Sequence, residues 1–419
     1  MNVKLAYGQG HLAVELPADR TTVIEPSHIP GLADERGEIL RALNNPIEAA
    51  PLREWIRPGN RICILFTDIT RATPNERIIP WLLDYLKDIP REQITLLNQL
   101  GTHRPNTRSE LEQMLTPEVV RNYRVLNHEP ENPAELVQLG TTCDGTPALL
   151  NRHFVEADVR IVTGFIEPHF FAGFSGGPKG IMPGIAGLDT VVSNHGAKNI
   201  GDSNSSFGIT QGNPIWEEMR DIALRAGRSF LLNVSLNEER QITGVFAGDL
   251  IAAHKVGYEF VRKSAMQKFD APFDIVVTTN SGYPLDQNLY QAVKGMSAGA
   301  RVIKPGGTLI MACECREGVP ADSWLDRILR SAASPEEILA RLATGGRQPE
   351  QWQAQIQALI QRKAQVLLYS SLPEPTVRAA HLTPCNDITA TVRQLLAGHA
   401  NGARIAVLPQ GPLTIPYLA

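Results

Sequence analysis

A glycine-rich segment in the middle of the chain carries the side chains best suited to chemistry, two histidines and one lysine. His169 lies near its start, Lys179 lies among the glycines, and His195 follows shortly after them. An imidazole can move protons or bind a metal ion, and a lysine amine can carry a covalent adduct. Glycines let a bulky group approach the backbone, whose N–H groups can hold an anion. The segment therefore predicts a ligand site.

The standard phosphate-binding motifs do not fit this segment. A P-loop requires Gly-x-x-x-x-Gly-Lys-Ser/Thr. Counting from Gly173 places Pro178 where the second glycine belongs, and Gly180 follows Lys179. The Gly-x-Gly-x-x-Gly pattern of dinucleotide folds is missing as well. A tight structural loop with an exposed lysine is the simpler interpretation of the glycines alone, but the flanking histidines and aromatic residues favour a functional site.

Polar side chains follow three short apolar runs, which we predict to be buried strands. The runs are residues 61–66, 93–100 and 159–165. Asp68 and Arg71 follow the first run, His103 the second and His169 the third. In an open parallel sheet the carboxyl ends of neighbouring strands line the crevice where ligands bind. We therefore expect these side chains to converge despite their separation along the chain.

Several kinds of chemistry are open to these residues. Two imidazoles facing one pocket can deliver and remove protons near neutral pH. Arg71 can grip a carboxylate through two parallel hydrogen bonds, and Asp68 can orient Arg71 or a histidine. A zinc site made by His103, His169 and His195 is the competing hypothesis. A surface Asp–Arg pair, which would contribute little, is the simpler alternative for the first motif.

The chain predicts two α/β domains with parallel-type sheets and an active-site cleft between them. The alternation of strands and helices restarts near residue 270, with a strand at 274–279, a helix at 289–300, a turn at 304–307 and a strand at 308–313. We assign residues 1–268, together with the C-terminal segment 392–419, to the first domain and residues 270–390 to the second. A short helix with Asp189 as its N-cap is expected to carry His195.

Composition narrows the class of protein. A chain of 419 residues favours two domains, and a net charge of −4 argues against a nucleic-acid partner. No apolar run is long enough for a membrane span, and the first residues lack the apolar core of a secretion signal. An odd number of cysteines without framework spacing predicts reduced thiols in a cytoplasmic protein. The five cysteines are scattered except for Cys313 and Cys315. This pair is more consistent with the end of a buried strand than with a metal site.

Five ordered motifs together resemble the nickel-dependent lactate racemase family, over most of the chain. The motifs are Asp68-Ile69-Thr70-Arg71, Gly101-Thr102-His103-Arg104-Pro105, the loop 168–187, Asn194-His195-Gly196 and Tyr290-Gln291-Ala292-Val293-Lys294. Trp352 resembles a further family position. The resemblance implies an isomerase that racemises lactate or a similar short-chain 2-hydroxy acid.

The resemblance also implies a cofactor, the nickel pincer nucleotide. This group is a pyridinium-3-thioamide-5-thiocarboxylic acid mononucleotide that binds Ni(II) through two sulfurs and a ring carbon. By the resemblance Lys179 carries it covalently and His195 is the protein ligand of the nickel, while His103 and His169 are the general acid/base pair. The hydrogen on C2 would leave as a hydride and return to the other face, because no side chain accepts a hydride. Cofactor-biosynthesis proteins would then be needed for maturation.

The remaining site residues are assigned to the substrate and to the cofactor. Arg71 and Lys294 would hold the substrate carboxylate, and Tyr290, Gln291 and Trp352 would shape its pocket. On the sequence alone, Tyr290 and Lys294 share one face of a predicted helix, where solvated side chains are about equally expected. The residues predicted to hold or support the cofactor besides Lys179 are Asp68, Thr70, Ser175, Gly176 and Gly177.

Three other functions compete with this prediction. The first is the epimerisation of a larger hydroxy acid or sugar acid with the same cofactor. The second is a zinc hydrolase built on three histidines, and the third is a carboxylate-binding protein that uses Arg71 and Lys294 without catalysis. Substrate panels, metal analysis and turnover measurements separate them.

Overall fold

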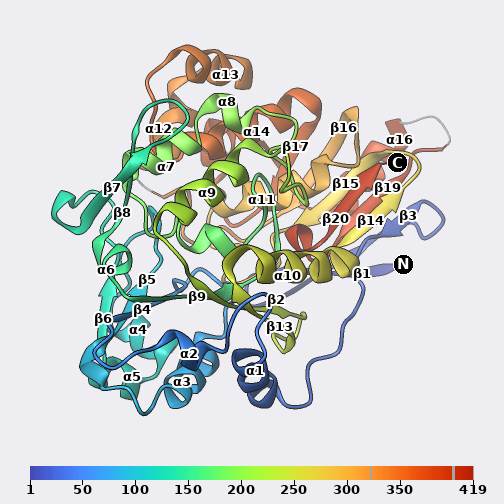
Figure 1. The fold of residues 1–419 in the computed structure, drawn as a ribbon. Coiled ribbons are helices and arrows are strands. Elements are labelled where there is room, and N and C mark those ends of the chain that lie inside the picture. The colour runs from blue at the N-terminus through green and yellow to red at the C-terminus, as the bar shows by residue number, and fades with distance from the viewer. Residues whose placement is uncertain (321–322, 399–401, 419) are drawn as a thin grey trace.

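Two six-stranded sheets organise the chain (Figure 1) in the computed structural model, which describes residues 1–320, 323–398 and 402–418. Both sheets are parallel apart from one edge strand of the first, so the predicted α/β class with parallel-type sheets is confirmed. Among the described residues, every helix is too short or too polar to cross a lipid bilayer.

The first sheet contains the three strands predicted to precede the site. In spatial order its strands are β13 (Ile242–Asp249), β12 (Phe230–Leu236), β9 (Val159–Phe165), β4 (Ile62–Phe66), β5 (Ile94–Asn98) and β6 (Arg124–Asn127). Strands β9, β4 and β5 are adjacent and parallel. Their carboxyl ends therefore lie at one edge, as the apolar runs predicted.

Both faces of the first sheet are covered, which explains why its strands are apolar throughout. Ile62, Ile64 and Phe66 of β4 face one cluster of buried side chains, and Cys63 and Leu65 face another. The helices over the first face include α1 (Glu35–Asn44), α3 (Asn75–Tyr85) and α4 (Arg108–Leu115). The second face is covered by α9 (Pro214–Arg225), α10 (Leu250–Ala265) and the glycine-rich segment.

The second sheet is entirely parallel. In spatial order its strands are β18 (Thr383–Pro384), β17 (Gln365–Tyr369), β16 (Ile303–Ala312), β15 (Phe273–Thr279), β19 (Ile405–Leu408) and β3 (Thr21–Val23). The predicted helix is α11 (Leu289–Ala300), and it packs beside α14 (Gln351–Lys363). The buried face of β15 and β16 shares one continuous apolar cluster with the second face of the first sheet.

Two predictions about the second sheet need correction. The segment 392–419 was assigned to the first domain, but its strand β19 pairs with β15 and β3 of the second sheet; residues 399–401 and 419 of the segment lie outside the described residues. The N-terminal hairpin β1 (Asn2–Tyr7) and β2 (Gly10–Glu15) also packs on this sheet. The turn predicted at 304–307 lies within β16, where the pairing with β15 is irregular.

The remaining elements connect or cover these sheets. They are α2 (Leu52–Trp55), α5 (Pro117–Asn122), the hairpin β7 (Leu136–Thr141) and β8 (Pro147–Asn151), α6 (Arg152–Val155), β10 (Pro168–His169), β11 (Gly173–Phe174), α7 (Leu188–Asn194), α8 (Ala197–Ile200), β14 (Met266–Phe269), α12 (Trp324–Ser331), α13 (Pro335–Thr344), α15 (Glu374–Ala379), α16 (Ile388–Gly398) and β20 (Ile415–Leu418).

Candidate active site

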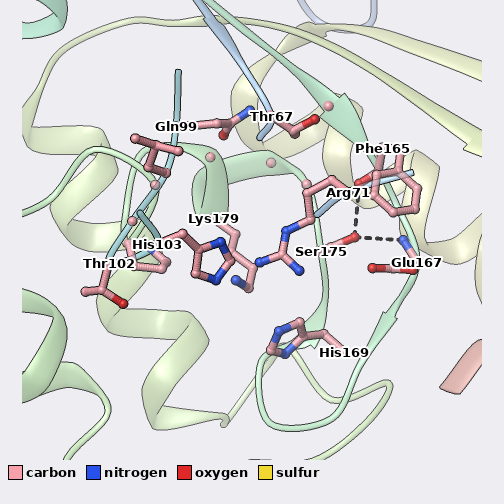
Figure 2. A pocket seen from close by; sticks show the side chains of 18 of the residues that line it. Thr67, Arg71, Gln99, Thr102, His103, Phe165, Glu167, His169, Ser175 and Lys179 are labelled. Carbon is pink, nitrogen blue, oxygen red and sulfur yellow. Dashed lines mark hydrogen bonds between the residues drawn. The ribbon is translucent and has the colours of Figure 1, made fainter. Parts of the chain in front are cut away.

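A pocket lies at the carboxyl ends of β4, β5 and β9, where Arg71, His103, His169 and Lys179 gather (Figure 2). Helices α11 and α14, which pack beside the second sheet, form its opposite wall. Its empty space, open mouth included, is about 980 Å³. All of the predicted site residues line it except Asp68 and Thr70. Those that line it are Arg71, His103, His169, Ser175, Gly176, Gly177, Lys179, His195, Tyr290, Gln291, Lys294 and Trp352.

Asp68 and Thr70 lie behind His103 rather than in the pocket. The Asp68 carboxylate is buried, and its Oδ2 lies 2.6 Å from His103 Nδ1. Its Oδ1 accepts hydrogen bonds from the Thr70 amide and hydroxyl, at 2.7 and 2.6 Å. Burial opposes ionisation, but the facing His103 ring, Arg71 and the Thr70 hydroxyl hold the pKa of Asp68 well below its usual range. Asp68, held by Thr70, therefore orients His103, and the role of both residues in supporting the cofactor stays a prediction.

His169 sits in an aromatic enclosure and is only 7% exposed. Its ring centroid lies 4.9 Å from that of Phe170 and 4.5 Å from that of Phe171. The amide of Ala172 donates to His169 Nδ1 at 3.2 Å. Burial, reinforced by the positive charges of Lys179, Lys294 and Arg71, lowers the pKa of His169 well below its usual value. The ring is therefore neutral at pH 7, and Nε2 is its free nitrogen.

The glycine-rich loop is fastened from two sides, which leaves one amide free. Asn233 Oδ1 accepts from the Gly177 amide at 2.8 Å, and His254 Nε2 donates to the Ser175 carbonyl at 2.9 Å. The Ser175 amide donates to the Glu167 carbonyl. Of the backbone amides of Ser175, Gly176 and Gly177, only that of Gly176 has no hydrogen-bond partner within the described part of the chain. It is therefore the amide of this loop that remains available to an anion.

Gly177 shows why this loop needs glycine. Its φ is +55°, a conformation that residues with a Cβ rarely adopt. An added Cβ would lie 2.3 Å from Cγ of His254. The imidazole that fastens the loop therefore occupies the space that a side chain would need.

Lys179 presents an amine prepared for nucleophilic chemistry. It lies in the 3-10 turn Gly177–Gly180 and is half-buried at the pocket wall. Burial, together with Arg71 and Lys294, lowers the pKa of Lys179 to about 7. Near neutral pH a large share of this side chain is therefore the unprotonated amine, the form that attacks carbonyl-type carbon.

His195 is oriented by a buried relay of polar side chains. Its Nδ1 lies 2.9 Å from Asn194 Oδ1, and Asn194 Nδ2 donates to Glu218 Oε2 at 2.8 Å. Because the amide nitrogen of Asn194 is engaged by Glu218, its oxygen is the acceptor and His195 carries its proton on Nδ1. Burial, with the charge of Lys179, lowers the pKa of His195 to about 3. Its free Nε2 is therefore available to a metal, in the arrangement typical of metal-binding histidines.

The local helix around His195 differs from the prediction. Helix α7 begins at Leu188 with Gly187 as its N-cap, and Asp189 is its second residue. His195 is the C-cap residue. The backbone turn at this helix end, rather than a position on the helix face, therefore directs the ring into the pocket.

The second sheet contributes binding groups on two helices. Tyr290, Gln291 and Lys294 lie on α11, and Trp352 lies on α14. Trp352 Nε1 donates to the Tyr290 hydroxyl at 3.0 Å, and its ring packs edge-on against His195 with centroids 4.9 Å apart. The side-chain oxygen of Gln291 is buried without a hydrogen-bond partner among the described residues. This wall thus offers both a direct contact to His195 and an unused acceptor to a ligand.

Three cationic side chains converge on the pocket without partners. In the described part of the chain, the guanidinium of Arg71 and the amines of Lys179 and Lys294 make neither an ion pair nor a hydrogen bond. Burial and the charge of Arg71 lower the pKa of Lys294 to about 7. Glu167 is the acidic group among them, and burial raises its pKa despite these cations. An excess of unpaired positive groups is what an anion-binding site requires.

Sequence reasoning missed Glu167, Asn233 and Glu218 as site residues. Glu167 directly precedes Pro168 and His169, so its position in the motif was the available signal. Asn233 lies inside β12 and Glu218 inside α9, and both are buried. Polar residues inside predicted elements give no local sign of which distant loop or side chain they bind.

The arrangement does not support a multi-histidine metal site. Within residues 1–320, 323–398 and 402–418, no group of three or more histidine, cysteine or acidic side chains could hold a metal ion. His103, His169 and His195 therefore do not form the competing zinc site. Cys313 and Cys315 are buried with their sulfurs 3.4 Å apart, just beyond the end of β16. A metal bound at His195 would need ligands from another molecule.

Comparison with known proteins gives one consistent result. The lactate racemase N-terminal domain family matches residues 7–208, and the lactate racemase C-terminal domain family matches residues 269–415. A lactate racemase of Thermoanaerobacterium thermosaccharolyticum is 34% identical over 98% of both chains. A lactate racemase of Lactiplantibacillus plantarum is 35% identical over 96% of this chain and 98% of its own.

Solved structures agree with the sequence comparisons. The structure of the lactate racemase apoprotein from T. thermosaccharolyticum superposes with a TM-score of 0.92 at 33% identity, covering 99% of this chain and 100% of that chain. A crystal structure of a protein from Thermotoga maritima has a TM-score of 0.72 at 20% identity, covering 94% and 100%. The latter shares the fold.

Proposed function

This chain belongs to the lactate racemase family, and from that premise we propose that it is an isomerase that racemises lactate or a similarly short 2-hydroxy acid. The observation that carries the proposal is the convergence of Arg71, Lys179 and Lys294 on a pocket that His103 and His169 also line, with no ion pair to any of the three cations among the described residues. Such a pocket can hold an anionic substrate while protons move at its C2 oxygen.

The substrate carboxylate would be held by Arg71 and Lys294. Arg71 comes from the loop after β4 and Lys294 from α11, so the two groups reach the pocket from different sheets. A planar guanidinium fixes a carboxylate through two parallel hydrogen bonds, and an ammonium adds charge without fixing direction. Arg71 therefore orients the acid and Lys294 completes its neutralisation.

The pocket fits the nickel pincer nucleotide that the family resemblance implies. Lys179 would carry the group covalently, since its amine is unpaired and has a pKa of about 7. Nε2 of His195 would bind the nickel, and the group would bring the other donors, because no set of three or more metal-ligating side chains gathers in the described part of the chain. The Gly176 amide and the Gln291 side-chain oxygen would be free to bind its polar atoms. When bound, such a group supplies an acceptor for the hydrogen that leaves C2 with its electron pair.

Proton transfer at the substrate would belong to the histidines. Nε2 of His103 takes the hydroxyl proton, and the buried Asp68 carboxylate stabilises the imidazolium that forms. Nε2 of His169 faces the same pocket and contacts the C2 oxygen of the opposite enantiomer. Phe170 and Phe171 around His169, and Trp352 against His195, exclude water from the reacting groups.

A labelling experiment tests this function. Protein made with the cofactor-biosynthesis proteins is given L-lactate with deuterium on C2, and both enantiomers are separated and weighed by mass spectrometry. We expect D-lactate that retains the deuterium. Loss of the deuterium to water would favour simple deprotonation, and no D-lactate from this or any short 2-hydroxy acid would contradict the proposal. A panel of larger hydroxy acids separates the racemase from an epimerase of sugar acids.

A further inference from the structure

We propose that the two pocket histidines hold their protons on opposite nitrogens, so that His103 presents a proton acceptor to the pocket and His169 presents a proton donor. The proton positions follow from the fold alone. Their consequence for the reaction rests on the proposed function. Asp68 and the backbone amide of Ala172 are the groups that set the difference.

His103 is fixed by a partner that only accepts hydrogen bonds. The Asp68 carboxylate lies 2.6 Å from its Nδ1, and Thr70 donates two hydrogen bonds to the other carboxylate oxygen. An ionised carboxylate has no proton to give, so the proton between the two groups belongs to Nδ1. Nε2 of the neutral ring is therefore an unprotonated base, as in catalytic His–Asp pairs.

His169 is fixed by a partner that only donates. The Ala172 amide points at its Nδ1 from 3.2 Å. A backbone N–H cannot accept a hydrogen bond, so Nδ1 must carry the lone pair and the neutral ring carries its proton on Nε2. A proton on Nδ1 would face the amide hydrogen directly. His169 can therefore become a base at Nε2 only after the Ala172 hydrogen bond has been lost.

The positive surroundings of His169 disfavour the alternative, a doubly protonated ring. The ring is 7% exposed, and Arg71, Lys179 and Lys294 are the charged groups that most oppose its protonation. His195 adds to the same effect. A neutral histidine that donates from Nε2 can polarise a carbonyl, a known catalytic use of this tautomer.

The consequence is that the two directions of the reaction are not mirror images. The enantiomer whose hydroxyl contacts His103 faces an unprotonated Nε2, which can take the hydroxyl proton directly. The enantiomer whose hydroxyl meets His169 must wait for that ring to move its proton from Nε2 to Nδ1. During the intervening keto-acid stage, His169 Nε2–H can hydrogen-bond the carbonyl oxygen. When that proton passes to the C2 oxygen, the ring stays neutral only if Nδ1 gains a proton, so the proton that His103 took from the first enantiomer must be returned to His169 through solvent. The His169 half of the reaction therefore carries an additional step.

Nitrogen NMR of the cofactor-free protein tests the proton positions directly. The chain is labelled with ¹⁵N on its histidine rings, and His103→Ala and His169→Ala identify the two spin systems. We expect the long-range proton–nitrogen pattern of an Nδ1–H ring for His103 and of an Nε2–H ring for His169. His128 and His254 are internal references for the second pattern, because their Nε2 atoms donate to the carbonyls of Ala186 and Ser175. An Nδ1–H ring or an imidazolium at His169 near pH 7 would overturn the proposal.

Asp68→Ala provides the matched control in the same spectra. Loss of the carboxylate should release His103 into a mixture of tautomers and leave the pattern of His169 unchanged. An unchanged His103 pattern in this variant would show that Asp68 does not set it, which contradicts the proposal. A general change of all histidine signals would mark an unfolded variant, in which case Asp68→Asn, which retains an acceptor oxygen, is compared instead.

Steady-state kinetics of the loaded enzyme test the consequence. Two enantiomers have equal free energies in water, so kcat/KM is the same in both directions of a racemase. The asymmetry must therefore appear as unequal kcat values matched by equally unequal KM values. Breaking one buried hydrogen bond predicts a difference of roughly five- to one-hundred-fold. Equal kcat values would overturn the kinetic half of the proposal. An enzyme that racemises nothing would contradict the proposed function but leave the NMR result standing.

Discussion

The two walls of the pocket are built differently. On the wall of the first sheet, His103, His169 and His195 each have a ring nitrogen engaged by a fixed partner, Asp68, the Ala172 amide and Asn194. On the wall of the second sheet, the amine of Lys294 and the side-chain oxygen of Gln291 have no hydrogen-bond partner among the residues that the structure describes. The first wall holds its reactive groups in place before any ligand arrives, and the second offers groups that a ligand must satisfy.

This difference separates chemistry from binding. Groups that move protons must be placed accurately, and buried hydrogen bonds from a rigid sheet provide that placement. Groups that hold a substrate contribute mainly when the substrate is present. Arg71 is the exception, because it belongs to the first sheet but is unpaired. We therefore expect substitutions on the first wall to lower kcat and substitutions of the binding groups to raise KM.

The largest effect is expected for Lys179→Ala. Without the amine the cofactor has no covalent attachment, so racemisation should fall below detection. Intact-mass measurement should show an adduct on the natural protein and none on the variant. Lys198→Ala, at an exposed lysine on α8, is the matched control and should keep both the adduct and the activity. Full activity in Lys179→Ala would end the proposal of a tethered cofactor.

Removal of either pocket histidine should cost somewhat less. General acid–base catalysis typically contributes about 10²- to 10⁴-fold, so His103→Ala and His169→Ala should each lower kcat by about that factor. Because kcat/KM must stay equal for the two enantiomers, both directions should suffer together. His153→Ala, whose ring pairs with Glu135 outside the pocket, should leave the rate unchanged. Near-normal turnover in both pocket variants would remove the histidines from the mechanism.

Acid should destabilise the half of the molecule that contains the first wall. The histidines whose burial lowers their pKa, His128, His169, His195 and His254, all lie there. In the unfolded chain these rings take up protons below pH ~6.5, whereas the folded His128 and His254 stay neutral down to about pH 4. The stability that these two neutral rings contribute to the fold is therefore fully present above pH ~6.5 and is lost as the pH drops toward 4.

The size of this acid effect can be measured by hydrogen exchange. A pKa lowered from ~6.5 to about 4 corresponds to roughly 3 kcal/mol of lost stability at pH 4 for one ring. Exchange rates, corrected for the intrinsic effect of pH, should rise first in β9, β12 and α10 between pH 6.5 and 4. His128→Gln should reduce the acid sensitivity without removing it. Exchange that rises first in β15 and β16 would show that acid destabilises the other half of the molecule, which contradicts the prediction.

Three strands of the first sheet could be predicted from the sequence because each is marked by a local pattern. Strands β4, β5 and β9 are short apolar runs with polar residues directly after them, and the parallel-sheet rule then placed Arg71, His103 and His169 together. The sheet to which β19 belongs could not be predicted from the sequence. Its residues would suit either sheet, and its pairing with β15 joins segments more than a hundred residues apart. Apolar pattern predicts a strand, but not its neighbours.

The same distinction applies within the site. The predicted site residues line the pocket, apart from Asp68, which contacts His103, and Thr70, which contacts Asp68. Asn233 and Glu218 were missed because they act on loops far away in the chain. Residues that touch a ligand cluster in recognisable motifs, whereas residues that hold them in place can come from any element.

Arg71→Lys should show whether direction or charge matters in carboxylate binding. Lysine keeps the positive charge but loses the planar pair of donors. Charge-assisted hydrogen bonds contribute about 1.5–3 kcal/mol, so we expect KM to rise by about ten- to one-hundred-fold. Lys294→Arg is the converse change on the other wall, and the initial rates over a range of lactate concentrations measure both. An unchanged KM in Arg71→Lys would mean that the carboxylate is held elsewhere.

The smallest effect is expected where the two walls meet. Trp352→Phe keeps the aromatic contact with His195 but removes the indole N–H that donates to the Tyr290 hydroxyl at 3.0 Å. One neutral hydrogen bond contributes about 1 kcal/mol, so KM should rise about five-fold while kcat stays within a factor of two. Tyr290→Phe removes the same bond from the other side, and the double variant should be no worse than either single variant. If Trp352→Phe instead lowers kcat by ten-fold or more with KM unchanged, the second wall orients the His195 ring, and the separation of chemistry from binding fails at this contact.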